Sequence, residues 1–149
     1  MRARAKFRIT DAPQTLRQRP WFVMGRLALL FRRHSAARLA RLGLTIRQYA
    51  VLCCLAEYDA SSQKDIAART GIDASDLVPV LDTLQEQIHV LRERDDVDQR
   101  RGAVRITESG ERLLKRAAAR LDAVESELFG ALSAAERTQL CELLKRAFS

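Results

Sequence analysis

A mainly α-helical fold with one small β-hairpin is predicted by three features of this sequence. Leu and Ala dominate a hydrophobic fraction of 47%, aromatic residues make up 5%, and three prolines interrupt 149 residues, which favours helices over sheets. Apolar residues recur at helical spacing along most of the chain. One segment instead alternates with a period of two on both sides of a charged turn. We therefore expect a single domain over residues 1–149, long enough to bury a core without metal or disulfides.

The first two helices are delimited by their end signals. The first is expected from Pro20 to Arg41, because proline suits the first turn of a helix and apolar residues follow at helical spacing. Thr45 and Gln48 then match a capping box, in which each side chain satisfies a free backbone N–H of the other residue. This box opens a helix to about Tyr58 that is apolar almost all round, so it is expected to be buried.

Two shorter helices follow, separated by a glycine turn. Ser62 can cap the first of them, and Gly71 ends it as a left-handed turn residue. Either Asp73 or Ser75 starts the second. Its expected buried face consists of aliphatic residues at helical spacing: Leu77, Val80, Leu81, Leu84 and Ile88.

A hairpin and a long helix come next. Residues 90–94 and 103–106 alternate around the polar turn 95–102, which predicts a β-hairpin. Thr107 caps a long helix that is expected to reach about Leu132.

The apolar faces at the two ends of the chain predict a second copy. Ser133 and Glu136 match another capping box, which opens a final helix. An apolar face is expected on each of these helices. On the long helix it consists of Leu113, Leu114, Ala117, Leu121, Val124, Leu128 and Leu132. On the final helix the inward face consists of Leu140, Leu143, Leu144 and Phe148. With the apolar side of residues 21–42 they exceed what one small lobe can bury. Residues 20–43 and 108–149 are therefore expected to be dimerisation helices.

Charge is unevenly distributed along the chain. Residues 1–47 carry a net +11 and residues 48–149 a net −4, within an overall +7. A basic arm, residues 1–19, ahead of a mildly acidic body points to a polyanionic partner such as double-stranded DNA. The alternative is a solvated basic segment that serves solubility alone.

The order of elements in residues 44–107 is helix, glycine turn, helix and polar hairpin. This is the order of a winged helix-turn-helix, a DNA-binding unit in which the second helix enters the major groove. The hairpin carries Arg100, Arg101 and Arg105, and basic hairpins reach phosphates and minor grooves.

The same segments resemble the MarR family of transcriptional regulators from about Trp21 to Phe148. The matching motifs are Leu44-Thr45 with Gln48, Ser62-Gln63-Lys64-Asp65-Ile66-Ala67, Gly71-Ile72, Leu81-Asp82 with Leu84, Asp98-Gln99-Arg100, and Ile106-Thr107 with Gly110. The resemblance implies a homodimer with interlocked terminal helices, a palindromic operator, and often a small-molecule pocket between the lobes. Such regulators are repressors or activators of transcription.

Site residues follow from the resemblance position by position. The base-reading surface is expected at Ser75, Asp76, Val78 and Pro79, and the phosphate-contacting helix start at Ser62, Gln63 and Lys64. Arg100 matches the wing arginine, with Asp98 bracing it and Arg101 beside it. The chain departs from the family by having Asp76 and Pro79 where Thr and Arg are usual, and Ile88 where a glycine is usual. Between Asp73 and Val90 it has four acids and no Lys or Arg.

An effector pocket is expected on the first two helices. Trp21, Met24, Arg26, Tyr49 and Cys53 offer aromatic, sulfur and guanidinium groups that suit a small planar aromatic or acidic ligand. Ordinary core packing with a solvated arginine is the alternative for these residues.

The sequence shows no motif that favours an enzyme, a metal-binding protein or a membrane protein. No catalytic constellation is expected, because His34 and His89 are isolated and there is neither a nucleophile pattern nor a Gly-rich phosphate loop, and no cofactor is implied. Cys53, Cys54 and Cys141 have no metal-ligand spacing. Cys53 and Cys54 lie in an apolar run and are expected to be small buried hydrophobes or, alternatively, redox sensors. No apolar run approaches the ~18 residues of a membrane span, so we expect a cytoplasmic protein. Besides a regulator, the remaining possibility is a winged-helix dimer that has lost DNA binding and serves as a ligand-binding or protein-interaction module.

Overall fold

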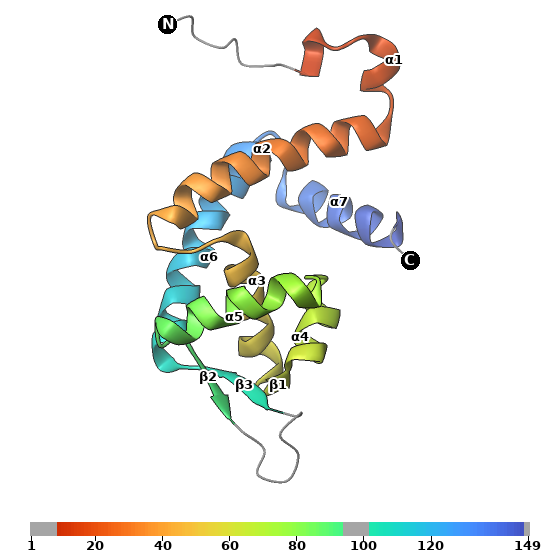
Figure 1. Ribbon diagram of the computed structural model, residues 1–149. Helices are drawn as coiled ribbons and strands as arrows, with labels where there is room; N and C mark the ends of the chain where they lie inside the picture. The colour runs from red at the N-terminus through yellow and green to blue at the C-terminus, as the bar shows by residue number, and fades with distance from the viewer. Residues whose placement is uncertain (1–8, 94–101, 148–149) are drawn as a thin grey trace, which may run out of the picture.

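The computed structural model describes residues 9–93 and 102–147 as helices around one small sheet (Figure 1). The helices are a short 3-10 turn Ile9–Asp11, α1 Gln14–Arg17, α2 Pro20–Ala40, α3 Ile46–Tyr58, α4 Gln63–Thr70, α5 Ala74–Glu86, α6 Glu108–Leu128 and α7 Ala134–Ala147. The strands are β1 Ser61–Ser62, β2 Val90–Glu93 and β3 Ala103–Ile106. The predicted fold class, mainly helical with a small β-hairpin, is confirmed. The short α1 and the 3-10 turn were not predicted.

The helix-capping interactions predicted from the sequence are present in the structure. The Thr45 hydroxyl accepts a hydrogen bond from the Gln48 N–H (3.2 Å), and the Gln48 side chain accepts one from the Thr45 N–H (2.8 Å). Ser133 and Glu136 form the same reciprocal pair at the start of α7. Gly71 ends α4 in the left-handed conformation, with φ 67°. Because these interactions span three or four residues, local sequence is enough to specify them.

The sheet has one strand more than the predicted hairpin. Its order is β1-β3-β2 and all pairs are antiparallel, with Ser61 opposite Val104 and Arg92 also opposite Val104 on the other side. The extra strand, β1, ties the start of α4 to the hairpin. The hairpin tip, including Arg100 and Arg101, lies outside the described residues.

One core joins α3, α4, α5, the sheet and part of α6. Leu52, Leu55, Ile66, Leu81 and Val104 are among its fully buried members. α6 contributes Leu113, Ala117 and Leu121 from one stripe, and α2 contributes Leu39. Gly110 lies so close to the His89 carbonyl that a side chain there would collide with it, so this glycine brings α6 against the end of the α5–β2 connection. The lobe is therefore completed by the first half of α6.

Ile88 was wrongly predicted to lie on the buried face of α5. The helix ends at Glu86, and Ile88 lies beyond it in the left-handed conformation (φ 58°) with 66% of its surface exposed. The His89 N–H donates to the Leu84 carbonyl (2.8 Å), closing the helix in the manner usually made by glycine. The left-handed turn rotates Ile88 off the helix face and into solvent.

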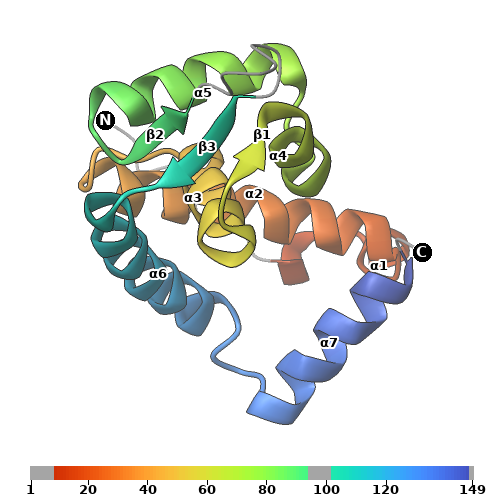
Figure 2. The same cartoon turned by 90° about the horizontal axis from the view of Figure 1, so that it is seen from below.

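The terminal helices extend beyond the lobe. In Figures 1 and 2 the first half of α2 reaches away from α3, and α7 lies apart from the small sheet. No residue of α7 is buried, so the prediction that its apolar residues face inward fails within one chain; Leu143 is 51% exposed. Phe148 lies outside the described residues. α6 also ends before Leu132, which lies in the turn to α7. The physical reason is that a single chain offers α7 no face to pack against.

Candidate nucleic-acid interface

The start of α4 presents polar side chains on a fixed turn. The Ser62 hydroxyl accepts from the Asp65 N–H (3.2 Å) and donates to the Asp65 carboxylate (2.6 Å). This hydrogen bond lowers the pKa of Asp65, so its carboxylate is charged. Gln63 and Lys64 are exposed on the same first turn. Both are thus free to contact an external anion, whereas Ser62 is occupied with capping the helix.

The second helix of the pair, α5, begins with a self-contained cap. Asp73 accepts hydrogen bonds from the Ser75 N–H (2.9 Å) and the Ser75 hydroxyl (2.7 Å). These bonds lower the pKa of Asp73, so its carboxylate is charged at the start of the helix. Pro79 does not break the helix, which continues to Glu86. Its missing N–H costs one bond, while its carbonyl accepts from the Thr83 hydroxyl (2.9 Å).

The outward ridge of α5 follows from helix geometry. At about 100° per residue, Ser75, Pro79 and Glu86 lie half a turn from the buried Leu77 and Leu81. Val78, which is exposed, lies on one flank of this ridge, and Asp76 lies on the opposite flank. Three of the four residues predicted to read bases are therefore exposed, and Asp76 is at the side and only partly exposed.

Two arginines from neighbouring elements pair with acids of α5. Arg47 Nη2, on the first turn of α3, lies 3.0 Å from Asp76 Oδ2. Arg92 Nη2, on β2, lies 2.7 Å from Asp82 Oδ1. The acidic helix noted in the sequence is therefore partly neutralised from both flanks. Local sequence gave no signal for either pair, because each joins elements that only the tertiary fold brings together.

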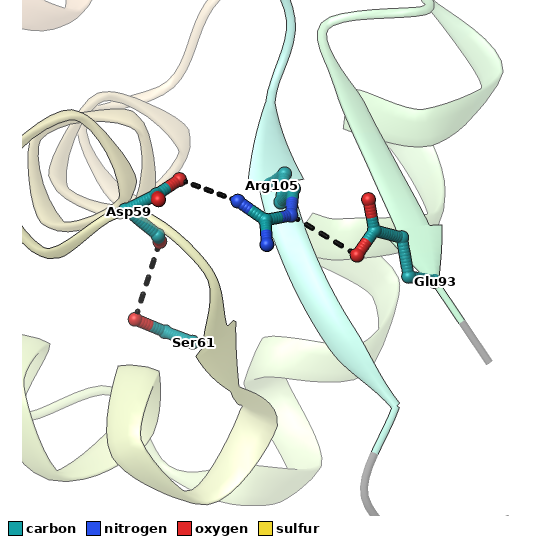
Figure 3. Close-up of polar contacts among 4 residues, drawn as sticks. All are labelled: Asp59, Ser61, Glu93 and Arg105. Atoms are coloured by element: carbon teal, nitrogen blue, oxygen red, sulfur yellow. Dashed lines mark hydrogen bonds and ion pairs between the residues drawn. The ribbon is translucent and has the colours of Figure 1, made fainter. Parts of the chain in front are cut away.

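A second arginine network holds the root of the hairpin (Figure 3). Arg105 Nη1 lies 2.9 Å from Asp59 Oδ1, and Arg105 Nε lies 3.0 Å from Glu93 Oε2. Hydrogen bonds to Glu93 and then to Asp59 raise the pKa of Arg105. The Ser61 hydroxyl donates to the Asp59 carbonyl (3.4 Å). Arg105 was grouped with the basic residues of the hairpin, but it joins three segments at the hairpin root; Arg100, Arg101 and Asp98 lie outside the described residues.

An open hollow of about 570 Å³ lies between α3 and α4. Tyr49 and Cys53 line it, together with Tyr58 and Arg69, which the sequence did not single out. Burial, followed by a hydrogen bond with Cys53, raises the pKa of Tyr49 to about 12, and burial also raises the pKa of Cys53. Both groups are therefore neutral near pH 7. The Arg69 guanidinium lies 4.2 Å from the centre of the Tyr58 ring and donates to the Ser61 hydroxyl (2.9 Å).

The other predicted pocket residues lie elsewhere in the chain. Trp21 is 66% exposed near the start of α2, and Met24 is also exposed. Neither they nor Arg26 line the hollow between α3 and α4. In Figure 1 this end of α2 reaches away from α3. One chain thus brings together two of the five predicted residues.

A basic hollow of about 540 Å³ lies between α2 and α6. It is lined by Arg33, His34, Ala37, Arg38, Arg41, Arg120 and Glu127. Glu127 pairs with Arg38 and lies 3.6 Å from His34, and the hydrogen bond from Arg38 is the main reason that its pKa is lowered. This ion pair fastens α2 to α6.

Residues 9–93 and 102–147 show neither a metal site nor a membrane-spanning helix. These residues contain no group of His, Cys, Asp or Glu arranged to hold a metal ion. Cys53, Cys54 and Cys141 are all free thiols. No helix among the described elements is both long and apolar enough to cross a bilayer.

Comparisons with known proteins agree with this geometry. The model of the MarR family matches residues 44–101. The transcriptional regulator TtmR of Methylorubrum extorquens is 36% identical over 100 residues, 67% of this chain and 51% of TtmR, so the match spans about half of that relative. Regulator HosA of Escherichia coli is 31% identical over 121 residues, which are 80% of this chain and 90% of HosA. The crystal structure of CouR from Rhodococcus jostii RHA1 bound to p-coumaroyl-CoA superposes with a TM-score of 0.78 at 30% identity, covering 89% of this chain and 94% of CouR.

Proposed function

This chain belongs to the MarR family of transcriptional regulators, and we propose that it binds a palindromic operator as a homodimer whose affinity a small ligand controls. Its named relatives are transcriptional regulators, so it is a DNA-binding regulator and not an enzyme. The observation that carries the proposal is the exposed outer face of α5, a helix that packs against α3, α4 and β2 through its other side.

Unpartnered apolar surface at both ends supports the homodimer. Trp21 and Leu29 are 66% and 53% exposed on α2, and α7 buries none of its residues. Surfaces of this kind mark a partner, and a two-fold copy would cover α2 and α7 together. We therefore propose residues 20–43 and 108–149 as the dimerisation helices and residues 44–107 as the DNA-binding lobe.

The proposed DNA contacts combine the lobe with the basic arm. Gln63 and Lys64, which are exposed on the first turn of α4, are proposed to contact phosphate, and the Ser62 cap supports that turn. The outer face of α5, with Ser75, Val78 and Pro79 exposed and Asp76 at its edge, is proposed to enter the major groove. Arg100 and Arg101 in the hairpin and the cations of residues 1–19 are proposed to add phosphate or minor-groove contacts.

The proposed ligand is a small planar aromatic or acidic molecule. The hollow beside Tyr49 and Cys53 offers an apolar wall with a phenol and a thiol. CouR, at 30% identity, was crystallised with p-coumaroyl-CoA, an aromatic and acidic molecule. Because α2 carries Trp21, Met24 and Arg26 away from α3 in its own chain, we propose that these residues act at the ligand site across the dimer.

An interaction module without DNA binding is the second candidate. The four acids of residues 73–90 and the proline on the outward ridge of α5 favour it. Against it, Asp76 and Asp82 each pair with an arginine, which lowers the repulsion that phosphates would meet.

Binding of DNA from upstream of the chain's own gene tests the proposal. Fluorescence anisotropy at 50 to 300 mM salt should show specific binding whose log affinity falls steeply with log salt, because phosphate contacts release counterions. Deleting residues 1–10, which contain Arg2, Arg4, Lys6 and Arg8, should weaken binding about tenfold or more and flatten that slope. Replacing these four residues with glutamine is the length-matched control, and it should do the same. Equal affinity of the truncated and full chains would remove the arm from the interface, and no specific binding by the full chain would favour the interaction module.

A further inference from the structure

We propose that Arg47, on α3 outside the helix-turn-helix pair, contacts DNA beside the recognition helix α5 and that Asp76 holds it in position. This inference rests on the proposed DNA-binding function and assigns to it a cation that α5 itself lacks. Arg47 Nη2 lies 3.0 Å from Asp76 Oδ2.

A helix in the major groove faces phosphates along both of its flanks. The groove is about 12 Å wide and is bounded on both sides by phosphates, so the flanks of an inserted helix need positive charge. Residues 73–90 contain neither Lys nor Arg. Asp76 lies on a flank of α5, about a quarter turn from its outward ridge. An uncompensated carboxylate there would repel the nearest phosphates, whereas the guanidinium of Arg47 at that flank attracts them.

The two arginines that flank α5 differ in how far their side chains are exposed. Arg92 lies on the face of β2 that also carries the buried Val90, and its side chain is 29% exposed. It is therefore packed between the sheet and α5. The Arg47 side chain is 55% exposed and that of Asp76 is 48% exposed. Arg92 thus fastens the hairpin to α5, while Arg47 keeps most of its donors accessible.

The position of Arg47 is electrostatically unfavourable within its own helix. It is the second residue of α3, where the partial positive charge of the helix start repels a cation. The capping box of Thr45 and Gln48 fixes this turn, and Gln48 is buried. The backbone of Arg47 is consequently held firmly while its side chain projects toward α5.

The arrangement leaves Arg47 competent to bind a phosphate or a guanine. A guanidinium has five N–H donors in a planar fork, and the ion pair with Asp76 occupies one nitrogen. An exposed pair of this kind adds little to stability, so its role in folding is small. Asp76 instead restricts the rotamers of Arg47 and so reduces the entropy lost on binding DNA.

Three variants of the full-length protein test the inference: Arg47→Ala, Arg92→Ala and Arg47→Ala combined with Asp76→Asn. The probe is the upstream DNA bound by the wild type, with Kd measured from 50 to 300 mM salt and thermal unfolding measured in parallel. Arg47→Ala should raise Kd about tenfold and reduce the salt slope by about one per chain, with Tm within about 1 °C of the wild type. Adding Asp76→Asn should recover part of that loss, because the exposed carboxylate is then gone. Arg92→Ala, the matched control, should lower Tm by several degrees, because it removes a packed guanidinium.

The possible outcomes distinguish a failure of the Arg47 inference from a failure of the proposed DNA-binding function. An unchanged Kd for Arg47→Ala, in a protein that binds its DNA normally, overturns the inference and leaves the proposed function intact. A Tm that falls as far with Arg47→Ala as with Arg92→Ala also overturns it, because Arg47 would then be a structural fastener. Failure of the wild type to bind any DNA overturns the proposed function itself.

Discussion

The DNA-binding lobe and the terminal helices use similar apolar sequences in opposite ways. In the lobe, Leu52, Ile66 and Leu81 are fully buried within one chain. At the ends, α2 buries Ser35 and Leu39 in 21 residues, and α7 buries none in 14. The core of the lobe is therefore buried within one chain, whereas the ends keep exposed apolar residues that the proposed second copy would cover. Helical periodicity predicts both kinds of helix equally well, because it identifies an apolar face and not the chain that covers it.

The largest effect expected from this contrast is on assembly. Leu143→Asp places a charge on the apolar face of α7, where the proposed partner would have to bury it. We expect the dimer dissociation constant to rise at least about 100-fold and operator affinity to fall with it. Light scattering coupled to size exclusion measures the change, and Glu142→Gln on the neighbouring position is the control. If the wild type is monomeric at micromolar concentration, the proposed homodimer is wrong.

The next effect concerns the stability of the lobe. Leu81→Ala leaves a cavity in a site with no solvent exposure and should lower the free energy of unfolding by about 2–5 kcal/mol. Val78→Ala on the exposed flank of the same helix should cost well under half as much. Urea denaturation of a monomeric background, such as the Leu143→Asp variant, measures both. Equal losses at the two positions would show that the core is not organised around the buried face of α5.

The smallest predicted effect is a gain in stability from replacing Ile88. Ile88→Gly relieves a β-branched residue held at φ 58° and should raise the free energy of unfolding by about 0.5–1 kcal/mol. The exposed side chain of Ile88 contributes little burial to offset this gain. Leu91→Gly, at an exposed and extended position of β2, is the control and should destabilise. Destabilisation by Ile88→Gly would mean that the isoleucine packs against the partner copy.

How far the sequence predicts this molecule depends on the distance over which each interaction acts. The capping boxes of Thr45 and Ser133 and the glycine turn at Gly71 were predictable because their partners lie within a few residues. Strand β1 was missed, because two serines become a strand only when β3 lies beside them. The pairing of Arg47 with Asp76 was missed for the same reason.

The candidate site was predicted unevenly. Ser75, Val78 and Pro79 are exposed, as a base-reading surface requires, and their contact with DNA stays a prediction. Of the predicted pocket residues, Tyr49 and Cys53 lie together, whereas Trp21 lies on a helix that diverges from them. No pattern within a sequence states how two helices diverge, because their packing angle depends on every side chain between them.

The positions of the core residues along the chain also determine when the lobe can fold during translation. The buried cluster runs from Leu39 to Leu121, so the lobe cannot close until most of α6 has left the ribosome. The apolar face of α2 emerges well before that point, and α7 emerges last. At about 5–20 residues per second, α2 then waits roughly 5–25 s for α7 to emerge. The lobe can thus fold before the proposed pairing of two chains, and α2 is the segment whose apolar residues stay exposed during that interval.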